Sequence, residues 1–249
     1  MICYYKFELL IFNYNSRFTE INIMKTSKSG AASILSQLNT GAHSGVNPSI
    51  SDSSTYVFNT AKDMSDTFEG TKEGCFLYSR HSTPSNNMLA SSLAAMEGSE
   101  AAHVFGSGMG AITAVLFQLC TAEDHIVSSR TIYGGTYALL KNFMPNYGVQ
   151  TSFVDTTDLQ AVTAAITPKT KVLYCEAMSN PLLEISDIEA LAAIAQKYQL
   201  TLVVDNTFTP LMITPLKHGA HIVIHSLTKF INGTSDAVAG VVCATEDFC

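Results

Sequence analysis

The sequence lacks the features that mark several common classes of protein. Its 249 residues carry a net charge of −7 and show no basic cluster, which gives no support for nucleic-acid binding. The longest unbroken apolar run near the N-terminus, residues 9–12, is too short for a membrane span or a signal sequence. The six cysteines form no CxxC pair. That spacing argues against a disulfide framework or zinc knuckle and predicts a reducing, cytoplasmic location.

Familiar catalytic signatures are also missing. Neither a Walker A segment nor an HExxH segment occurs. The glycines of residues 106–110 are spaced G-x-G-x-G, not G-x-G-x-x-G, and no acid follows the next apolar run. A nicotinamide enzyme that uses Arg130 on a 2′-phosphate stays open as an alternative. His218, His221 and His225 have no acid among them, so we interpret them as core residues and predict no metal site.

Short apolar runs alternate with helical patterns through most of the chain. This alternation predicts βαβ units and a mostly parallel α/β sheet with helices on both faces. In such sheets ligands bind beyond the carboxyl ends of the strands. The predicted strands cover residues 101–105, 125–129, 149–154, 171–175, 200–204 and 221–224, with a further apolar strand near the C-terminus. The predicted helices cover residues 88–96, 135–144, 158–166 and 185–198, and one follows the glycines and runs to Cys120.

Composition divides the chain into three parts. Residues 1–24 are rich in Tyr, Phe, Ile and Asn and are expected to be a non-native or disordered leader; a genuine N-terminal strand stays open. Residues 25–86 are polar and predict an extended arm with loops. Residues 87–249 form the α/β domain. They stop a few residues past an apolar strand, so we expect this domain to be incomplete.

Three of the predicted strands are followed by residues suited to ligand binding. The glycines of residues 106–110 open a helix, whose N-terminus favours an anion. Tyr133 is either a core residue or an aromatic that stacks on a flat ring. Asp205 follows an apolar run, where a carboxylate is costly unless it is paired. It is either a turn or capping residue, or the partner of a protonated ring nitrogen.

The segment VIHSLTKFINGTSD places Ser226, Thr228 and Lys229 at another strand end. One interpretation is a polar turn with an exposed lysine. A second is an anion site of hydroxyls and backbone N–H groups. A third adds a lysine that forms a Schiff base with an aldehyde cofactor. The joint placement of these residues with Asp205 and Tyr133 at strand ends favours the third, because one pocket can then hold a phosphate, a ring and an imine.

At these segments the sequence resembles the Cys/Met-metabolism, or trans-sulfuration, family of pyridoxal-phosphate-dependent enzymes. The matching segments are YSRHSTPS, GSGMGAI, YGGTY, EAMSNPLLEISDI, VVDNTFTPL and HSLTKFINGTSD, in the order of the family. The resemblance implies an aspartate-aminotransferase-like (fold type I) large domain, pyridoxal 5′-phosphate as cofactor and a small amino acid as substrate.

The resemblance also implies roles for particular residues. Lys229 would form the Schiff base and move protons, Asp205 would hold the pyridinium nitrogen, and Tyr133 would stack on the ring and assist the leaving group. The remaining implied cofactor contacts are the backbone of Gly108 and Met109 and the hydroxyls of Ser226 and Thr228 at the phosphate, Asn180 near the phenolic oxygen, and Tyr78 and Arg80 in the neighbouring subunit's phosphate site. The family therefore implies a homodimer, usually within a tetramer.

Carbon–sulfur lysis by γ-elimination on methionine- or cystathionine-type substrates is the activity we expect from the resemblance. Replacement at the γ-carbon of an acylated homoserine stays open, as does a non-catalytic remnant that only binds cofactor or partner subunits. Gly135 stands where the better-known methionine γ-lyases carry cysteine, which weakens that assignment. No arginine follows Arg130, so the family's grip on the substrate carboxylate would be missing and we expect the chain alone to have little activity.

Overall fold

A computed structural model describes residues 47–72 and 74–249 of the chain. The predicted leader, residues 1–24, and the first part of the predicted arm, residues 25–46, lie outside the described residues.

The described chain folds around one seven-stranded sheet with the order β1-β7-β6-β5-β4-β2-β3. Its strands are β1 (Ala101–Phe105), β2 (His125–Ser129), β3 (Gln150–Val154), β4 (Thr170–Glu176), β5 (Thr201–Asp205), β6 (Ile222–Ser226) and β7 (Gly240–Ala244). β2 to β6 pair in parallel, and β7 runs antiparallel to both β1 and β6. The predicted mostly parallel sheet is confirmed, and the reversed β7 is the feature that the strand pattern did not reveal.

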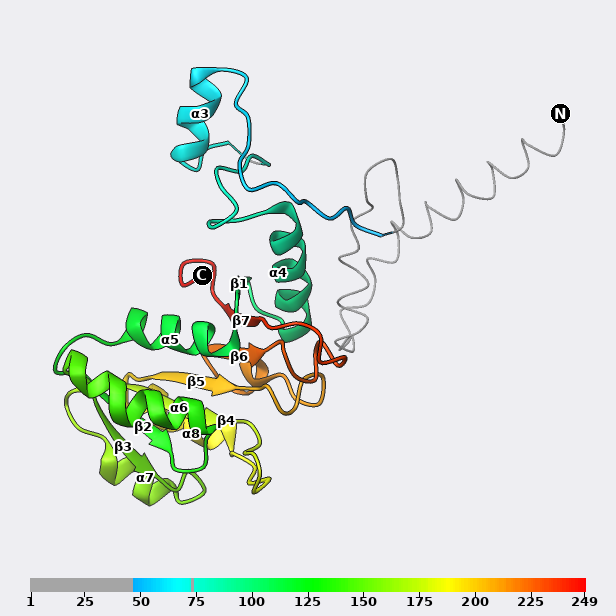
Figure 1. Cartoon of the computed structure of the whole chain (residues 1–249). Helices are drawn as coiled ribbons and strands as arrows, with labels where there is room; N and C mark the ends of the chain where they lie inside the picture. The colour runs from blue at the N-terminus through cyan, green and yellow to red at the C-terminus, as the bar shows by residue number, and fades with distance from the viewer. Residues whose placement is uncertain (1–46, 73) are drawn as a thin grey trace, which may run out of the picture.

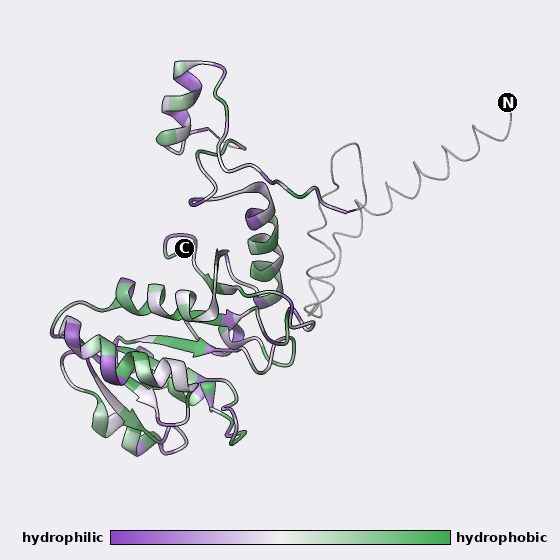
Figure 2. Ribbon diagram, viewed as in Figure 1, coloured by the Kyte–Doolittle hydropathy of each residue, from purple (hydrophilic) through white to green (hydrophobic). Residues whose placement is uncertain are grey.

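Helices cover both faces of this sheet (Figure 1). The helices are α3 (Ala61–Phe68), α4 (Pro84–Glu97), α5 (Gly108–Leu119), α6 (Gly134–Ala138), α7 (Leu159–Ala165) and α8 (Ile188–Tyr198). One buried cluster joins α4, α7 and α8 to one face, and the other joins α5 and α6 to the opposite face. Figure 2 shows apolar β5 between these layers, as expected for a strand buried on both sides. Among the described helices, none is long and apolar enough to cross a membrane.

Four helices differ from the sequence-based expectation. Helix α4 begins four residues earlier than predicted, because the Thr83 hydroxyl accepts the N–H of Asn86 and caps the helix. Helix α3 forms inside the predicted arm, where Thr60 caps its N-terminus and Lys62 pairs with Asp66 at i,i+4. The single helix predicted over residues 135–144 is divided into α6, a π-helical turn and a 3₁₀ turn that contains Pro145. Helix α8 starts later than predicted because the Asp187 carboxylate accepts the N–H of Ala190 and caps it.

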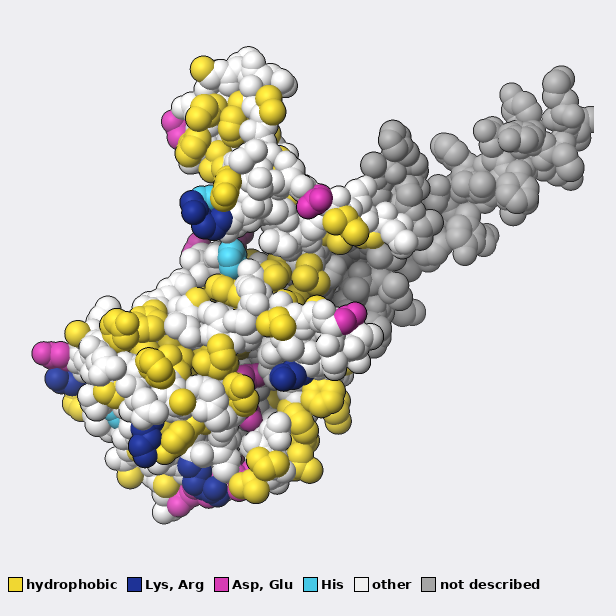
Figure 3. Space-filling view, in the orientation of Figure 1, with side chains coloured by type: hydrophobic (Ala, Val, Ile, Leu, Met, Phe, Trp, Pro, Cys, Tyr) yellow, Lys and Arg dark blue, Asp and Glu magenta, His cyan; other side chains and the backbone are white. Residues whose placement is uncertain are grey.

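The segment before α4 stands away from the body of the molecule (Figure 1). Figure 3 shows hydrophobic side chains on its surface. Val57 is 93% exposed and Phe68 is 64% exposed. Apolar side chains in this number on a projecting segment are unusual for an isolated chain.

Candidate active site

A cavity of about 940 Å³ opens at the carboxyl ends of β4, β5 and β6. It brings together every predicted site residue except Tyr78 and Arg80. The predicted residues in its lining are Gly108, Met109, Tyr133, Asn180, Asp205, Ser226, Thr228 and Lys229. The expectation that residues following different strands meet in one pocket is therefore met by the geometry.

Strand alternation decides which side chains face the cavity. Successive side chains of a strand point to opposite faces of the sheet. Val203 packs in the cluster beneath α5, so Asp205, two residues later, lies on that face as well. The same reasoning applies to Ile224 and Ser226 in β6. The cavity thus lies on the α5 side of the sheet.

The glycine-rich start of α5 forms one wall of the cavity. Ser107 caps this helix, with its hydroxyl accepting the N–H of Gly110 at 3.0 Å. A Cβ atom on Gly108 would lie 2.7 Å from the Cβ of Ser226, and one on Gly240 would lie 2.3 Å from the carbonyl oxygen of Ser107. Glycine is therefore required where the helix start, β6 and β7 approach each other, and free backbone N–H groups at this helix start suit an anion.

Gly108→Ala is expected to weaken binding of pyridoxal phosphate by about tenfold or more, because its methyl group displaces Ser226 or the helix start that faces the anion. Gly106→Ala is the matched control, since a Cβ at Gly106 meets nothing within 4 Å. Absorbance titration of each purified variant with pyridoxal phosphate measures the dissociation constant. Equal affinity of the two variants would contradict the role of this close approach.

Asp205 presents a buried carboxylate at the floor of the cavity. Its Oδ1 accepts the N–H of Thr207 at 3.0 Å, and its Oδ2 accepts the hydroxyl of Tyr174 at 3.4 Å. Burial raises the pKa of the Asp205 carboxyl, while these bonds and nearby His225 oppose the rise. A cationic partner in the cavity would restore the ionised form, because an opposite charge favours it.

Lys229 and Thr228 lie at the mouth of the cavity, in the turns that follow β6. Within residues 47–72 and 74–249, the Lys229 amine has no ion pair or hydrogen bond, so it is free to react. The Thr228 hydroxyl donates to the carbonyl of Ala239 at 3.2 Å and accepts its N–H at 3.1 Å. Thr228 would have to give up the first of these bonds to donate to a phosphate.

Glu176 is a site residue that the sequence reasoning passed over. Its Oε1 accepts the backbone N–H of Tyr133 at 2.6 Å, and its Oε2 accepts that of Asn180 at 3.3 Å. Burial, and then the charge of Asp205, raise the pKa of Glu176 to about 7. The carboxyl therefore changes charge near neutral pH while holding both residues. It ends β4, so the rule of reading strand ends could have identified it.

Tyr133 directly precedes α6 and is 52% exposed at the cavity. A Cβ atom at Gly135 would lie 2.5 Å from its ring and 3.1 Å from the sulfur of Met109. The absence of a side chain at Gly135 therefore leaves room for the Tyr133 ring in its present position.

Other lining residues were also missed. Thr207 links two predicted residues, since its N–H binds Asp205 and its hydroxyl accepts the N–H of Ser226 at 2.8 Å. Ser107 lies among the glycines but was assigned no contact. No local pattern marks Thr207 as a bridge between two strands, because the bridge depends on the parallel pairing of β5 and β6.

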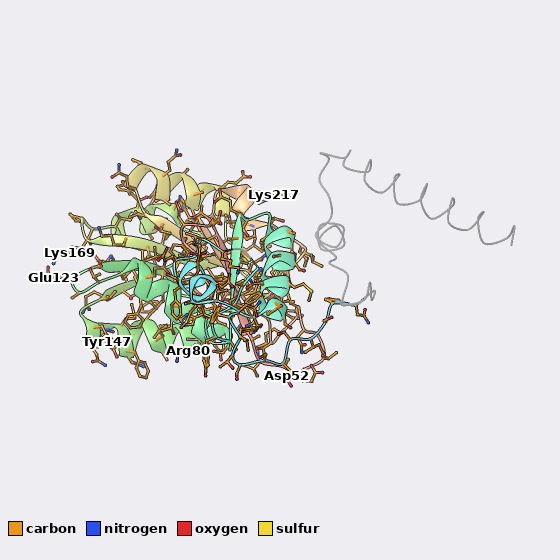
Figure 4. The ribbon with its side chains drawn as sticks, turned by 90° about the horizontal axis from the view of Figure 1, so that it is seen from above. Asp52, Arg80, Glu123, Tyr147, Lys169 and Lys217 are labelled. Carbon is orange, nitrogen blue, oxygen red and sulfur yellow. The ribbon has the colours of Figure 1, made fainter. Side chains whose placement is uncertain are left out.

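Tyr78 and Arg80 lie outside this cavity. Tyr78 forms an isolated antiparallel bridge with Thr55, and the guanidinium of Arg80 lies over its ring at 5.3 Å. In Figure 4, Arg80 lies away from Lys169 and Glu123, which form an exposed ion pair at the edge of the molecule. The two predicted cofactor contacts belong to the segment that precedes α4.

The three histidines have separate partners. His225 is fully buried against Glu97, His221 accepts the N–H of Leu202, and His218 pairs with Glu189. The core interpretation is confirmed for His225. It is wrong for His218 and His221, which retain exposed surface because they lie in the turn before β6 and at its edge.

Comparison with known proteins matches residues 31–248 to the model of the Cys/Met metabolism PLP-dependent enzyme family. A methionine gamma-lyase from Arabidopsis thaliana is 44% identical over 83% of this chain, and an O-succinylhomoserine sulfhydrylase from Pseudomonas aeruginosa is 43% identical over 76% of it. The alignments cover 48% and 47% of those proteins, so the chain spans about half the length of the curated relatives it matches.

Solved structures share the fold. A cystathionine gamma-lyase from Lactobacillus plantarum, complexed with L-serine, has a TM-score of 0.80 and 34% identity, covering 89% of this chain and 56% of that one. A Campylobacter jejuni structure described as an O-acetylhomoserine (thiol)-lyase carries N′-pyridoxyl-lysine-5′-monophosphate; it has a TM-score of 0.84 and 28% identity, covering 90% and 55%. With the family match and the cavity geometry, the chain belongs to the Cys/Met metabolism family of pyridoxal-phosphate-dependent enzymes.

Proposed function

We propose that the chain carries the cofactor site of a carbon–sulfur lyase that acts by γ-elimination on methionine- or cystathionine-type amino acids. The observation that carries this proposal is a free lysine amine, a buried carboxylate and a glycine-bounded helix start around one cavity. The methionine gamma-lyases among the relatives support the choice of reaction.

The residues present fit pyridoxal phosphate. Burial raises the pKa of the Asp205 carboxyl, so its ionised form needs a cationic partner. A protonated ring nitrogen would be such a partner. The backbone at Gly108 and the hydroxyl of Ser226 would hold the phosphate, and the exposed ring of Tyr133 would stack on the pyridine. The amine of Lys229 would form the covalent link.

When bound, the cofactor supplies an electron sink for the carbon beside the substrate amine. The chain's own groups then have separate tasks. The amine of Lys229 accepts and returns a proton at that carbon, since it lines the cavity and has no hydrogen bond or ion pair within the described residues. Asp205 holds a fixed negative charge at the floor. Glu176 accepts the backbone N–H of Tyr133, whose hydroxyl would assist the departing sulfur.

Replacement at the γ-carbon of an acylated homoserine is the second candidate. The similarity to an O-succinylhomoserine sulfhydrylase favours it, because that relative is nearly as identical to this chain as the methionine gamma-lyase is. Both reactions use the same cofactor residues. A non-catalytic chain that only binds cofactor or subunits is the third candidate.

The test saturates the purified chain with pyridoxal phosphate and measures 2-oxobutanoate release from methionine, cystathionine and O-acetylhomoserine, with and without a thiol. Release from methionine or cystathionine without a thiol supports elimination. Thioether formation from O-acetylhomoserine and the thiol, with no 2-oxobutanoate release from methionine or cystathionine, supports replacement instead. Cofactor binding without either reaction supports the third candidate for this chain.

The projecting segment suits a contact with a second copy of the chain. Tyr78 and Arg80 lie in it, outside their own chain's cavity, and exposed apolar side chains surround α3. Homo-oligomer assembly, and a neighbour's cavity as the place of Arg80, are therefore part of the proposal. Sedimentation of the chain with and without the cofactor tests assembly; a monomer in both conditions would contradict it.

The free cysteines among the described residues are consistent with the proposed cytoplasmic location.

A further inference from the structure

A buried polar network lies directly behind the cavity, on the opposite face of the sheet. Its members come from three places: Glu97 ends α4, Asn206 follows β5, and His225 lies in β6. The side chains of Glu97 and His225 are 1% and 0% exposed, and Asn206 is fully buried. None of the three lines the cavity, and the mechanism above does not use them.

Glu97 is the centre of this network. Its Oε1 accepts the Nδ2–H of Asn206 at 3.1 Å and lies 2.6 Å from Nε2 of His225. Because this oxygen acts as an acceptor for Asn206, Nε2 of His225 is the second donor. Asn206 is held further, with Nδ2 donating to the carbonyl of Ile213 and Oδ1 accepting the hydroxyl of Thr209.

The network is joined to the cavity by the backbone, because two of its residues are sequence neighbours of residues that line the cavity. Asn206 directly follows Asp205, and His225 directly precedes Ser226. Because neighbouring side chains of a strand point to opposite faces, fixing Asn206 and His225 behind the sheet fixes Asp205 and Ser226 in front of it. The backbone N–H of Asn206 also donates to the carbonyl of Ile224 at 2.8 Å and joins the two strand ends.

Stability alone is a poor explanation for this arrangement. Within the described part of the chain, Oε2 of Glu97 and Nδ1 of His225 are buried without a hydrogen-bond partner. Buried charged or polar groups with unmade bonds destabilise a fold relative to well-packed apolar residues. Apolar side chains surround the network, including Leu93 one turn earlier in α4.

We propose that Glu97 is a positioning residue for the cofactor cavity. From the far face of the sheet it holds Asn206 and His225 in the places that aim Asp205 and Ser226 at the ring and phosphate of the cofactor. The inference rests on the cofactor site proposed above. It assigns a cofactor-related task to a residue that touches neither cofactor nor substrate.

The experiment compares Glu97→Ala, Glu97→Gln and Leu93→Ala in the full chain. Glu97→Ala removes the acceptor, so we expect the dissociation constant for pyridoxal phosphate to rise about tenfold or more, as for other supporting contacts behind a binding site. Glu97→Gln keeps an acceptor oxygen for Asn206 and His225, so most of the affinity should return. Leu93→Ala leaves a cavity in the same helix and should lower stability while leaving the dissociation constant unchanged.

Two measurements separate positioning from folding: the urea midpoint of the cofactor-free chain, and absorbance titration with pyridoxal phosphate. Glu97→Asp keeps the carboxyl group but moves its oxygens by one methylene. It serves if Glu97→Ala does not fold, and it should also weaken cofactor binding. The inference would be overturned if cofactor affinity fell in proportion to the urea midpoint in every variant, so that Leu93→Ala lost as much affinity as a Glu97 variant of equal stability. Failure of the unmodified chain to bind the cofactor would instead overturn the cofactor site itself.

Discussion

Replacing Lys229 with alanine is expected to abolish covalent attachment of pyridoxal phosphate and to lower turnover by at least about a thousandfold in any form of the protein that has turnover. The amine lines the cavity and is the candidate for both the covalent link and proton movement. The measurement is borohydride reduction of the loaded chain followed by peptide mapping, which should place the pyridoxyl group on the Lys229 amine.

Lys169→Ala is the control for this result. Lys169 precedes β4 at the opposite end of the strands and pairs with exposed Glu123 at 3.1 Å. Its replacement should leave both the label and the cofactor affinity unchanged. Reversible binding should persist in Lys229→Ala, because the phosphate and ring contacts remain. A pyridoxyl group found on any other lysine would refute the assignment of Lys229.

In any form of the protein that has turnover, Asp205→Asn is expected to reduce turnover by on the order of a hundredfold or more, with a much smaller loss of cofactor affinity. Asparagine fills the same space and can still accept the N–H of Thr207. It carries no charge, so it cannot hold the ring nitrogen protonated, and the electron sink weakens. The phosphate contacts at Gly108 and Ser226 are untouched. Turnover and the dissociation constant are measured on the same preparations.

The pH dependence of the bound cofactor's absorbance gives a second measurement for Asp205. A carboxylate beside the ring nitrogen raises the pKa of that nitrogen, so the variant should lose the protonated form at lower pH. Asp187→Asn is the control, since it removes a carboxylate that caps α8 and asparagine caps nearly as well. An Asp205→Asn variant with undiminished turnover would make Asp205 a structural residue.

Much of the fold followed from the sequence because the central strands are short, continuous apolar runs. Val203 and Ile224, for example, are buried beneath α5 with helices on the far face as well, which leaves no polar alternation to confuse the pattern. The direction of β7 could not be derived in this way, because an apolar run such as Gly240–Ala244 is the same in either direction. Pairing decides it.

The candidate site was predictable where a residue lies at the end of its own strand, as Asp205 does. Residues that depend on tertiary pairing were not: Glu97 meets His225 across 128 residues of sequence, and nothing local to either marks the partner. Glu176 ends β4 and was within reach of the strand-end rule, but its bonds to the backbone of Tyr133 and Asn180 depend on the tertiary structure. Gly108 was predicted as an anion contact, while its close approach to Ser226 required the structure.

The position of β1 has a consequence for how the site is made. β1 pairs with β7 and leads directly into the start of α5, so the first strand of the described sheet has its only described sheet partner in β7, far along the chain. Such long-range pairing is slow, because the chain must close a large loop before the contacts form. During synthesis on the ribosome, β2 to β6 can assemble first, while the close approach of Gly240 to the start of α5 forms only after β7 has emerged. Cofactor capture is therefore expected late in folding, after the sheet has closed.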